Sequence, residues 1–230
     1  MKRSVVFALA VVLVVAAGVP VAGAAPGARV FEFVGTAAQC APGPAGATIV
    51  TSEWIPGIGL PDNLGSNVFD PGTGTPNKRD QRQGLLLSKN GSISDCSSAG
   101  AHIVNFVPIT VTTDSTIGFD IRNGSWCGAG APRFNVYVNG AFHGFLGCFH
   151  GDKTPAPQDP GAWTRVRFNL NQDYPGFTAI PVGDAVTRLD IVHDEGTDVT
   201  GHGMPGLAVI DNIQAAPGLL IPNRGYAIPE

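Results

Sequence analysis

Residues 133–145 read Arg-Phe-Asn-Val-Tyr-Val-Asn-Gly-Ala-Phe-His-Gly-Phe, and this stretch decides the fold class. Its centre is the dipeptide Asn139-Gly140, a strong signal for a two-residue type I′ turn, because both turn positions need a positive φ. β-Branched and aromatic residues flank the turn on both sides. We therefore expect a β-hairpin made of residues 133–138 and 141–147.

A two-residue turn also predicts the register of this hairpin. The expected cross-strand pairs are Val138–Ala141, Tyr137–Phe142, Val136–His143 and Phe134–Phe145. Both faces of the hairpin are then partly apolar, and His143 falls on an interior face. Such a strand pair is typical of a two-layer sandwich or of a position beside a covering loop.

The rest of the chain repeats this pattern. Only 14% of its residues are charged, and 31 Gly and 19 Pro punctuate short apolar runs. The expected strands are 29–35, 47–54, 84–89, 101–113, 116–122, 133–138, 141–147, 163–170, 186–194 and 206–214. No segment has a sustained helical period, so the sequence predicts an all-β, antiparallel β-sandwich with a jelly-roll-like fold. The stretches 55–83 and 149–162 lack periodicity and are expected to be long loops.

The first 24 residues have the features of a cleavable export signal. Lys2 and Arg3 precede an uncharged apolar run from Val5 to Val15, and Ala22-Gly23-Ala24 matches the small-residue cleavage pattern. The run is shorter than the roughly 20 apolar residues that span a bilayer. We therefore expect a secreted, extracellular protein whose residues 25–230 form one domain with no membrane span.

The charge of the mature chain argues against nucleic acid as a partner. Loss of Lys2 and Arg3 with the signal takes the formal net charge from −4 to −6. The densest basic group is Lys78-Arg79 with Arg82, in a loop rich in Gly, Pro and Asn. Phosphate recognition needs a clustered basic surface, which this sequence lacks.

Four cysteines remain after the signal, and an even number in an exported chain favours two disulfides. Three connectivities are possible. We favour Cys127–Cys148 and Cys40–Cys96, because the first pair flanks the predicted hairpin. The alternative is that all four are free buried thiols.

Residues 206–214 include the most informative polar position. Alternation places Leu207, Val209, Asp211 and Ile213 on one face of this strand. An aspartate among aliphatic side chains needs a partner or a cation. Two interpretations remain open at Asp211: a ligand of structural Ca²⁺, or a carboxylate bound to backbone amides or to an arginine.

The ending Ala208-Val-Ile-Asp-Asn-Ile213, after the strand Val186-Thr-Arg-Leu-Asp-Ile-Val-His-Asp194, resembles the last strands of secreted jelly-roll modules of the galactose-binding-like superfamily. That superfamily includes many carbohydrate-binding modules. The resemblance implies a structural Ca²⁺ held by a glutamate of the first strand and the aspartate of the last. The matching positions are Glu32 and Asp211.

Aromatic side chains give a candidate ligand site, because flat amphipathic rings pack well on sugars. Trp163, Arg165 and Arg167 share one face of the strand 163–170, and we expect this face to point outward. Tyr137 is a further candidate. The competing interpretation of Trp163 is a ring covered by a loop beside two solubilising arginines.

The sequence carries no signature of catalysis. It lacks a G-x-S-x-G motif and an isolated nucleophilic cysteine. A second acidic cluster, residues 193–198, suits Ca²⁺ less well than it suits a solvated turn. The leading hypothesis is a non-catalytic module that binds an extracellular glycan or a surface protein. The alternatives are a polysaccharide-active enzyme on the same fold and a structural or partner-binding protein of the cell surface.

Overall fold

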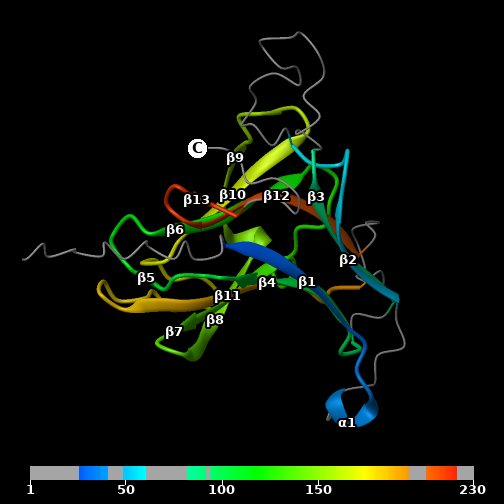
Figure 1. Ribbon diagram of the computed structural model, residues 1–230, viewed down its shortest axis with the longest axis horizontal. Coiled ribbons are helices and arrows are strands. Elements are labelled where there is room, and N and C mark those ends of the chain that lie inside the picture. The colour runs from blue at the N-terminus through cyan, green and yellow to red at the C-terminus, as the bar shows by residue number, and fades with distance from the viewer. Residues whose placement is uncertain (1–25, 41–48, 61–81, 92–93, 197–205, 222–230) are drawn as a thin grey trace, which may run out of the picture.

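The computed structural model describes residues 26–40, 49–60, 82–91, 94–196 and 206–221, which form two antiparallel β-sheets packed face to face (Figure 1). The order in sheet A is β1-β4-β11-β7-β8, with β5 beside β11. Its strands are β1 (Gly27–Phe33), β4 (Ser98–Val104), β5 (Ile109–Thr110), β7 (Arg133–Val138), β8 (Ala141–Gly147) and β11 (Ala185–His193).

The order in sheet B is β2-β3-β12-β6-β10-β9, with β13 beside β12. Its strands are β2 (Ile49–Ile55), β3 (Gly84–Asn90), β6 (Thr116–Arg122), β9 (Asp152–Pro155), β10 (Trp163–Asn169), β12 (Leu207–Ala216) and β13 (Leu219–Leu220). Two short helices, α1 (Ala37–Cys40) and η1 (Cys148–His150), complete the described elements. None of the helices in these ranges is long and apolar enough to cross a membrane.

Eight of the strands make a jelly roll. Among these eight, the chain passes from one sheet to the other at every connection except that between β7 and β8, which form a hairpin within sheet A. The resulting quartets are β3-β12-β6-β10 and β4-β11-β7-β8. In chain order these are strands 1-8-3-6 and 2-7-4-5 of the eight, which is jelly-roll pairing. β1 and β2 extend the two sheets at the same edge.

The core lies between the two sheets and is formed by the side chains that point inward at alternate positions along each strand. Ile117 and Phe119 of β6 and Val166 and Phe168 of β10 point inward and are fully buried, as expected. Phe134 of β7 lies across from them, with its ring centroid 5.6 Å from that of Phe119. The predicted two-layer sandwich is confirmed.

The predicted register of the β7–β8 hairpin is right at the turn and wrong beyond it. Val138 pairs with Ala141 and Tyr137 with Phe142, but Val136 pairs with Gly144 rather than with His143. A β-bulge accommodates His143 as one extra residue. His143 is therefore half-buried rather than interior, and its Nε2 lies 2.7 Å from the carbonyl oxygen of Thr178.

This bulge also changes the face on which an aromatic ring lies. Phe145 pairs with Asn135 instead of Phe134, and Phe134 pairs with Leu146. Phe142 and Phe145, three residues apart, consequently both lie on the outer face of sheet A. A regular strand would have placed them on opposite faces.

A second bulge lies in β12. Leu207, Val209 and Asp211 share the outer face of sheet B, as alternation predicts. Ile213 does not, because Asn212 (φ 44°) is an extra residue that turns Ile213 into the core. The expectation of one face for all four residues is wrong at Ile213 for this reason.

All ten expected strands are present, with bounds that differ by a few residues. The stretch 101–113 is divided into β4 and β5 by a turn at Asn105 (φ 53°). The loop 149–162 contains η1 and β9, which the sequence pattern did not indicate. Residues 1–24, with the expected export signal, lie outside the described ranges.

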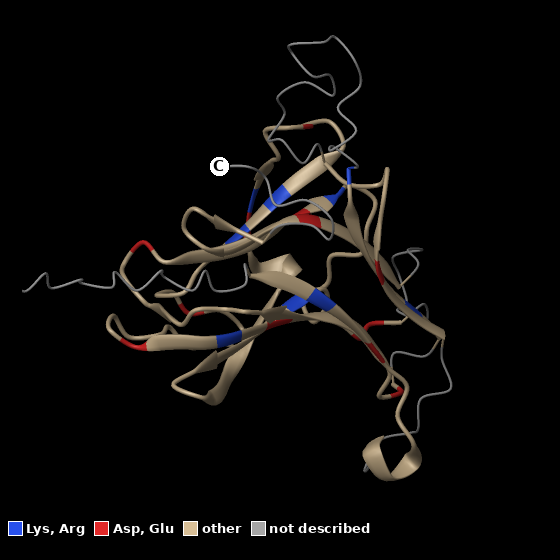
Figure 2. Cartoon of the chain, viewed as in Figure 1, with Lys and Arg blue, Asp and Glu red and all other residues tan. Residues whose placement is uncertain are grey.

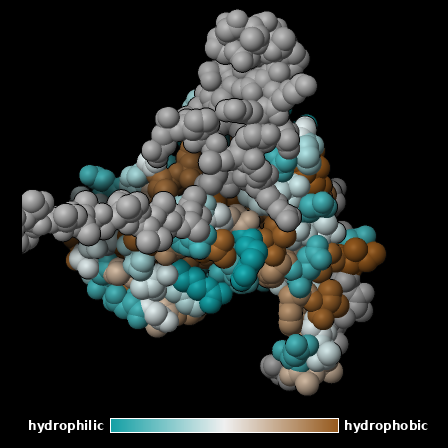
Figure 3. All heavy atoms as spheres, viewed as in Figure 1, coloured by the Kyte–Doolittle hydropathy of each residue, from teal (hydrophilic) through white to brown (hydrophobic). Residues whose placement is uncertain are grey.

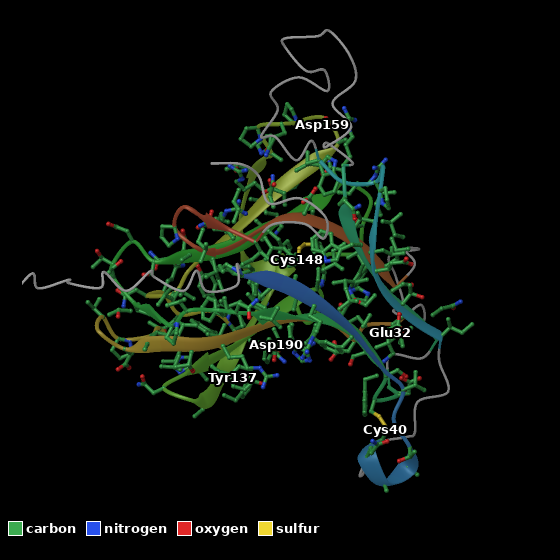
Figure 4. The ribbon with its side chains drawn as sticks, in the orientation of Figure 1. Glu32, Cys40, Tyr137, Cys148, Asp159 and Asp190 are labelled. Atoms are coloured by element: carbon green, nitrogen blue, oxygen red, sulfur yellow. A yellow bond between two sulfur atoms is a disulfide. The ribbon has the colours of Figure 1, made fainter. Side chains whose placement is uncertain are left out.

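Both predicted disulfides are confirmed. Cys40–Cys96 fastens α1 to the segment before β4, where α1 projects from the end of the sandwich (Figure 1). Cys127–Cys148 lies between the two sheets (Figure 4), and Cys148 belongs to the core. The described residues contain no free cysteine.

Candidate functional site

The outer face of sheet A carries the polar and aromatic side chains that the core excludes. In β11, Leu189 and Ile191 point into the core, so Arg188, Asp190 and Val192 point outward. Register then places the outward residues of β4, β7 and β8 in rows beside them. Figure 4 shows Asp190 and Tyr137 together on this side of the sheet.

One row contains a guanidinium held between an aromatic ring and a carboxylate. Arg188 donates from Nε to Asp190 Oδ1 (3.0 Å), and its Nη2 lies 2.7 Å from Asp190 Oδ2. The guanidinium carbon lies 4.7 Å from the centroid of the Tyr137 ring. The hydrogen bond to Asp190 raises the pKa of Arg188. Phe142 contacts Tyr137 edge-on, with centroids 5.5 Å apart.

His102 of β4 continues this row towards β1. Its Nδ1–H donates to Asp190 Oδ1 at 2.8 Å, and its ring stacks on Phe31 with centroids 4.5 Å apart. The neighbouring Gly100 allows this, because a Cβ there would clash with the Phe31 ring. Asp190 is thus an almost fully buried carboxylate with two cationic or polar neighbours.

A second guanidinium lies farther along β7 in the same kind of environment. Arg133 donates from Nη1 and Nη2 to the two carboxylate oxygens of Asp194, at 2.5 and 2.8 Å. Its guanidinium carbon lies 5.8 Å from the centroid of the Phe145 ring. Further bonds to Asn135 Oδ1 (3.0 Å) and to the Gly130 carbonyl (2.8 Å) fix its position.

An open groove of about 680 Å³ runs over this face. Aromatic side chains of the two outer strands, β1 and β8, contribute to its lining, and Ser98 and Val192 lie on the strands between them. Its lining residues are Phe33, Asp95, Cys96, Ser98, Gly130, Arg133, Asn135, Phe142, Phe145, Val192, Asp194 and Glu195.

Glu195 joins the loop after β11 to the loop before β7 at this groove. Its carboxylate accepts hydrogen bonds from the Trp126 indole N–H and from the backbone N–H of Gly130 (3.2 Å). The Cys127–Cys148 disulfide lies next to the same segment. These contacts fix the side of the groove near Gly130, because the same segment is linked to the core through Cys148.

The charges of the described residues do not separate into blocks. Figure 2 shows Lys and Arg positions interspersed with Asp and Glu positions on the strands. On the face seen in Figure 3, hydrophilic surface likewise alternates with separate hydrophobic patches. Arg133 in the groove and Arg188 beside it on the same face are each paired with a carboxylate.

The predicted ligand site on β10 is not an exposed aromatic surface. The Trp163 side chain is 2% exposed and packs with Leu60, Ala156 and Val209 in a second hydrophobic cluster outside sheet B. The expectation that Trp163 points outward to solvent is wrong, because residues 58–60 cover it. Strand alternation predicts that Trp163 lies on the outer face of the sheet, but it does not predict the segment that covers this face.

Arg165 and Arg167 do lie on the outer face of sheet B, but their guanidinium groups are engaged. Arg165 donates from Nε and Nη2 to the two oxygens of the buried Asp120, at 3.0 and 3.1 Å. Arg167 Nη1 lies 3.3 Å from Asp120 Oδ1, and burial lowers the pKa of Arg167. Of the four predicted ligand-binding residues, only Tyr137 lies on the groove face.

The two predicted calcium ligands, Glu32 and Asp211, lie on different sheets. Glu32 Oε1 accepts the backbone N–H of Ser52 (2.9 Å). Asp211 accepts the backbone N–H groups of Leu60 and Asn212, each at 2.7 Å. Calcium needs six to eight oxygen ligands, and these oxygens already face N–H donors. Within the described ranges no group of three or more His, Cys, Asp or Glu could hold a metal ion.

The acidic cluster at 193–198 is only partly described, since residues 197–205 lie outside the described ranges. Its first residue, His193, is fully buried, and its ring lies next to the backbone of Gly206. Burial lowers the pKa of His193 to about 4, and the charges of Arg133 and Lys89 act in the same direction. Asp194 and Glu195 turn outward into the groove.

Sequence reasoning missed most of the residues on this face of sheet A. Arg188 and Asp190 are two residues apart in a strand that is otherwise apolar, which is the pattern that had singled out Asp211. That signal was available for β11 as well. The position of Phe145 on the outer face was not predictable from the sequence, since it depends on a bulge.

Comparison of the chain with known protein families, curated proteins and solved structures finds no match.

Proposed function

We propose that this protein is a secreted, non-catalytic carbohydrate-binding module whose site is the groove on the outer face of sheet A. The observation that carries the proposal is the combination of aromatic rings and Arg–Asp pairs on one open face. Phe145, Arg133 and Asp194 line the groove itself. Tyr137, Arg188 and Asp190 lie beside it on the same face, where Tyr137 contacts the groove residue Phe142.

Sugars suit such a surface for two reasons. Their C–H faces pack on aromatic rings, which bury apolar area without losing much conformational freedom. Their hydroxyl groups donate and accept hydrogen bonds at once, so a carboxylate beside a guanidinium offers both complements. The paired side chains are also held in place before the ligand arrives, which lowers the entropic cost of binding.

The extracellular location is part of this proposal. It rests on the export-type features of residues 1–24 and on two disulfides, which persist in oxidising compartments. An extracellular jelly roll with an open groove meets glycans of cell walls, matrices or secreted polymers.

Affinity electrophoresis on gels that contain single polysaccharides tests the proposal, followed by titration calorimetry with those that retard the protein. We expect Tyr137→Ala to weaken binding at least about tenfold, or about 1.4 kcal/mol. Arg165→Ala is the matched control, since Arg165 makes the same kind of bidentate pair on the opposite sheet. Its affinity should equal that of the wild type.

Two results would overturn the proposal. One is the absence of binding to every glycan tested at millimolar concentration. The other is equal loss of affinity in Arg165→Ala and Tyr137→Ala at unchanged thermal stability, which would move the site away from sheet A. Capture of a surface protein without any sugar affinity would favour the partner-binding alternative instead.

A polysaccharide-active enzyme is the second candidate, and one observation favours it. Asp194 and Glu195 place two carboxylates in the same groove, and glycoside hydrolysis uses a pair of carboxylates. Release of reducing ends from a bound polysaccharide, abolished in Glu195→Gln, would establish this activity. Binding without release, at high protein concentration and long incubation, would exclude it for that polymer.

A further inference from the structure

The outer face of sheet A contains the same arrangement of three side chains twice, once in the groove and once beside it. Each copy has a guanidinium that is bonded bidentately to an aspartate and lies over an aromatic ring. In the first, Arg188 contacts Asp190 and Tyr137. In the second, the corresponding residues are Arg133, Asp194 and Phe145. The first copy takes Arg and Asp from β11, and the second takes Arg from β7 and Asp from the residue that follows β11.

The two copies are separated along one strand. Tyr137 and Arg133 both belong to β7 and are four residues apart, which corresponds to roughly 13 Å at the rise of an antiparallel strand. Both point to the outer face, because an even separation keeps side chains on one side of a sheet. The copies therefore form two sites in series along the outer face of sheet A rather than one site with more contacts.

Asn135 lies between the two copies and connects them. It occupies the central outward position of β7, opposite Asp190 on one side and Phe145 on the other. Its side-chain oxygen accepts from Arg133 Nε, so its amide group has a fixed orientation. A ligand that reaches both copies must pass over this amide, which supplies polar contacts along the path.

The charge of each copy is balanced within the protein. Each guanidinium meets both oxygens of one carboxylate, so neither copy offers an uncompensated positive charge to an anion. An anionic sugar would have to compete with the aspartate for the guanidinium and would face carboxylate repulsion. A neutral ring with adjacent hydroxyl groups meets no such penalty.

We infer that the outer face of sheet A binds a neutral oligosaccharide chain through two subsites, one in the groove at Arg133–Asp194–Phe145 and one beside it at Tyr137–Arg188–Asp190. This inference rests on the proposed function and specifies its ligand as an internal stretch of an uncharged polysaccharide. Occupancy of one subsite places the next sugar rings close to the other, so the second contact becomes intramolecular.

The test is calorimetric titration with a series from monosaccharide to hexasaccharide, prepared from a neutral polysaccharide that the protein binds. Affinity should rise at least tenfold between the monosaccharide and the length that reaches both subsites, and then level off. Arg188→Met and Arg133→Met should each lower hexasaccharide affinity to about that of a short oligosaccharide. Arg165→Met, on the opposite sheet, should leave the whole series unchanged.

Arg133 also donates a hydrogen bond to the Gly130 carbonyl oxygen, so its substitution affects the loop before β7 as well as the subsite. Phe145→Ala is therefore a second variant of that subsite, and Tyr137→Ala is its equivalent in the other. Thermal unfolding and the affinity for a short oligosaccharide report whether each variant is still folded. The double variant Tyr137→Ala/Phe145→Ala should lose binding of all lengths.

The outcomes distinguish failure of the two-subsite inference from failure of the proposed binding function. A monosaccharide that binds as tightly as the hexasaccharide, or a preference for uronic-acid polymers over neutral ones, would overturn the two-subsite inference while the binding function stands. An absence of affinity for any glycan would instead overturn the function on which the inference rests.

Discussion

Lys89 and Asp95 form an ion pair inside the protein, with Nζ 3.1 Å from Oδ1 and the lysine side chain wholly buried. The same ammonium group donates to the carbonyl oxygens of Asp95 (2.9 Å) and Asp194 (2.8 Å). One cation thus joins β3 of sheet B to two segments that line the groove on sheet A. Burial raises the pKa of Asp95, but hydrogen bonds from Ser97 and the charge of Lys89 outweigh it, so this pKa is lowered.

Substitution Lys89→Met should lower the free energy of unfolding by about 3–5 kcal/mol, since it leaves a buried carboxylate without its cation. It should also weaken glycan binding, because Asp95 and Asp194 lose a shared donor. Lys153→Met is the control: Lys153 also donates to carbonyl oxygens, but its side chain is exposed. Urea denaturation should give a clearly smaller loss for the control, and equal losses would show that burial of Lys89 is unimportant.

Stability should fall as the pH is lowered from about 6.5 towards 4, because of His193. Its folded-state pKa of about 4 lies below the ordinary value of 6.5, so within this window the unfolded chain binds a proton that the folded protein does not. The full effect is roughly 3 kcal/mol. Denaturation of His193→Leu across this window should show a flatter profile, whereas His150→Gln, at a half-buried site, should keep the wild-type slope.

Trp163→Ala and Tyr137→Ala should have opposite consequences. Loss of the buried Trp163 ring should cost about 3 kcal/mol of unfolding free energy and leave glycan affinity of the folded protein unchanged. Loss of Tyr137 should weaken binding with a much smaller effect on stability. A glycan affinity that falls in Trp163→Ala and not in Tyr137→Ala would place the ligand on sheet B.

The two disulfides should differ in how much they contribute to the free energy of unfolding. Their sequence separations of 56 and 21 residues give loop-closure contributions of about 4 kcal/mol for Cys40–Cys96 and about 3 kcal/mol for Cys127–Cys148. The double variant Cys40→Ala/Cys96→Ala should also weaken binding, since Cys96 lines the groove. Chemical denaturation measures the loss of stability in this variant, and calorimetry measures its glycan affinity. An unchanged affinity would contradict the expected role of Cys96 at the groove.

A thermal melt with EDTA, compared with one in added Ca²⁺, tests the metal that the family resemblance implies. We expect the same midpoint in both, because Glu32 and Asp211 lie on different sheets and accept backbone N–H groups. A midpoint that rises with Ca²⁺ concentration would indicate a bound ion by mass action and would return these carboxylates to a ligand role.

The sequence was sufficient for the fold because strand alternation and the Asn-Gly turns are local signals. The turn at Asn139-Gly140 predicts its two nearest cross-strand pairs correctly. The bulges at His143 and Asn212 were not predictable, since one extra residue leaves the pattern of apolar residues almost unchanged while it reverses the face of all that follows. Phe145 and Ile213 were misplaced for this reason.

The site was harder to predict, because alternation assigns a face but does not say what covers it. Trp163 and Tyr137 are both outward-facing aromatics beside an arginine, and only the first is buried by a distant segment, residues 58–60. The Arg133–Asp194 pair joins residues 61 positions apart. Contacts of this range follow from the assembly of the whole sandwich and not from any local stretch.

The internal neutralisation of Arg188 and Arg133 has a consequence for where this protein can work. Neither Arg–Asp pair carries a net charge that would steer a ligand from beyond contact distance, so added ions have little to screen at these two positions. If the proposed site binds an uncharged polymer, its affinity should therefore change little between low and high salt, whereas adhesion through a basic surface would weaken as salt is added.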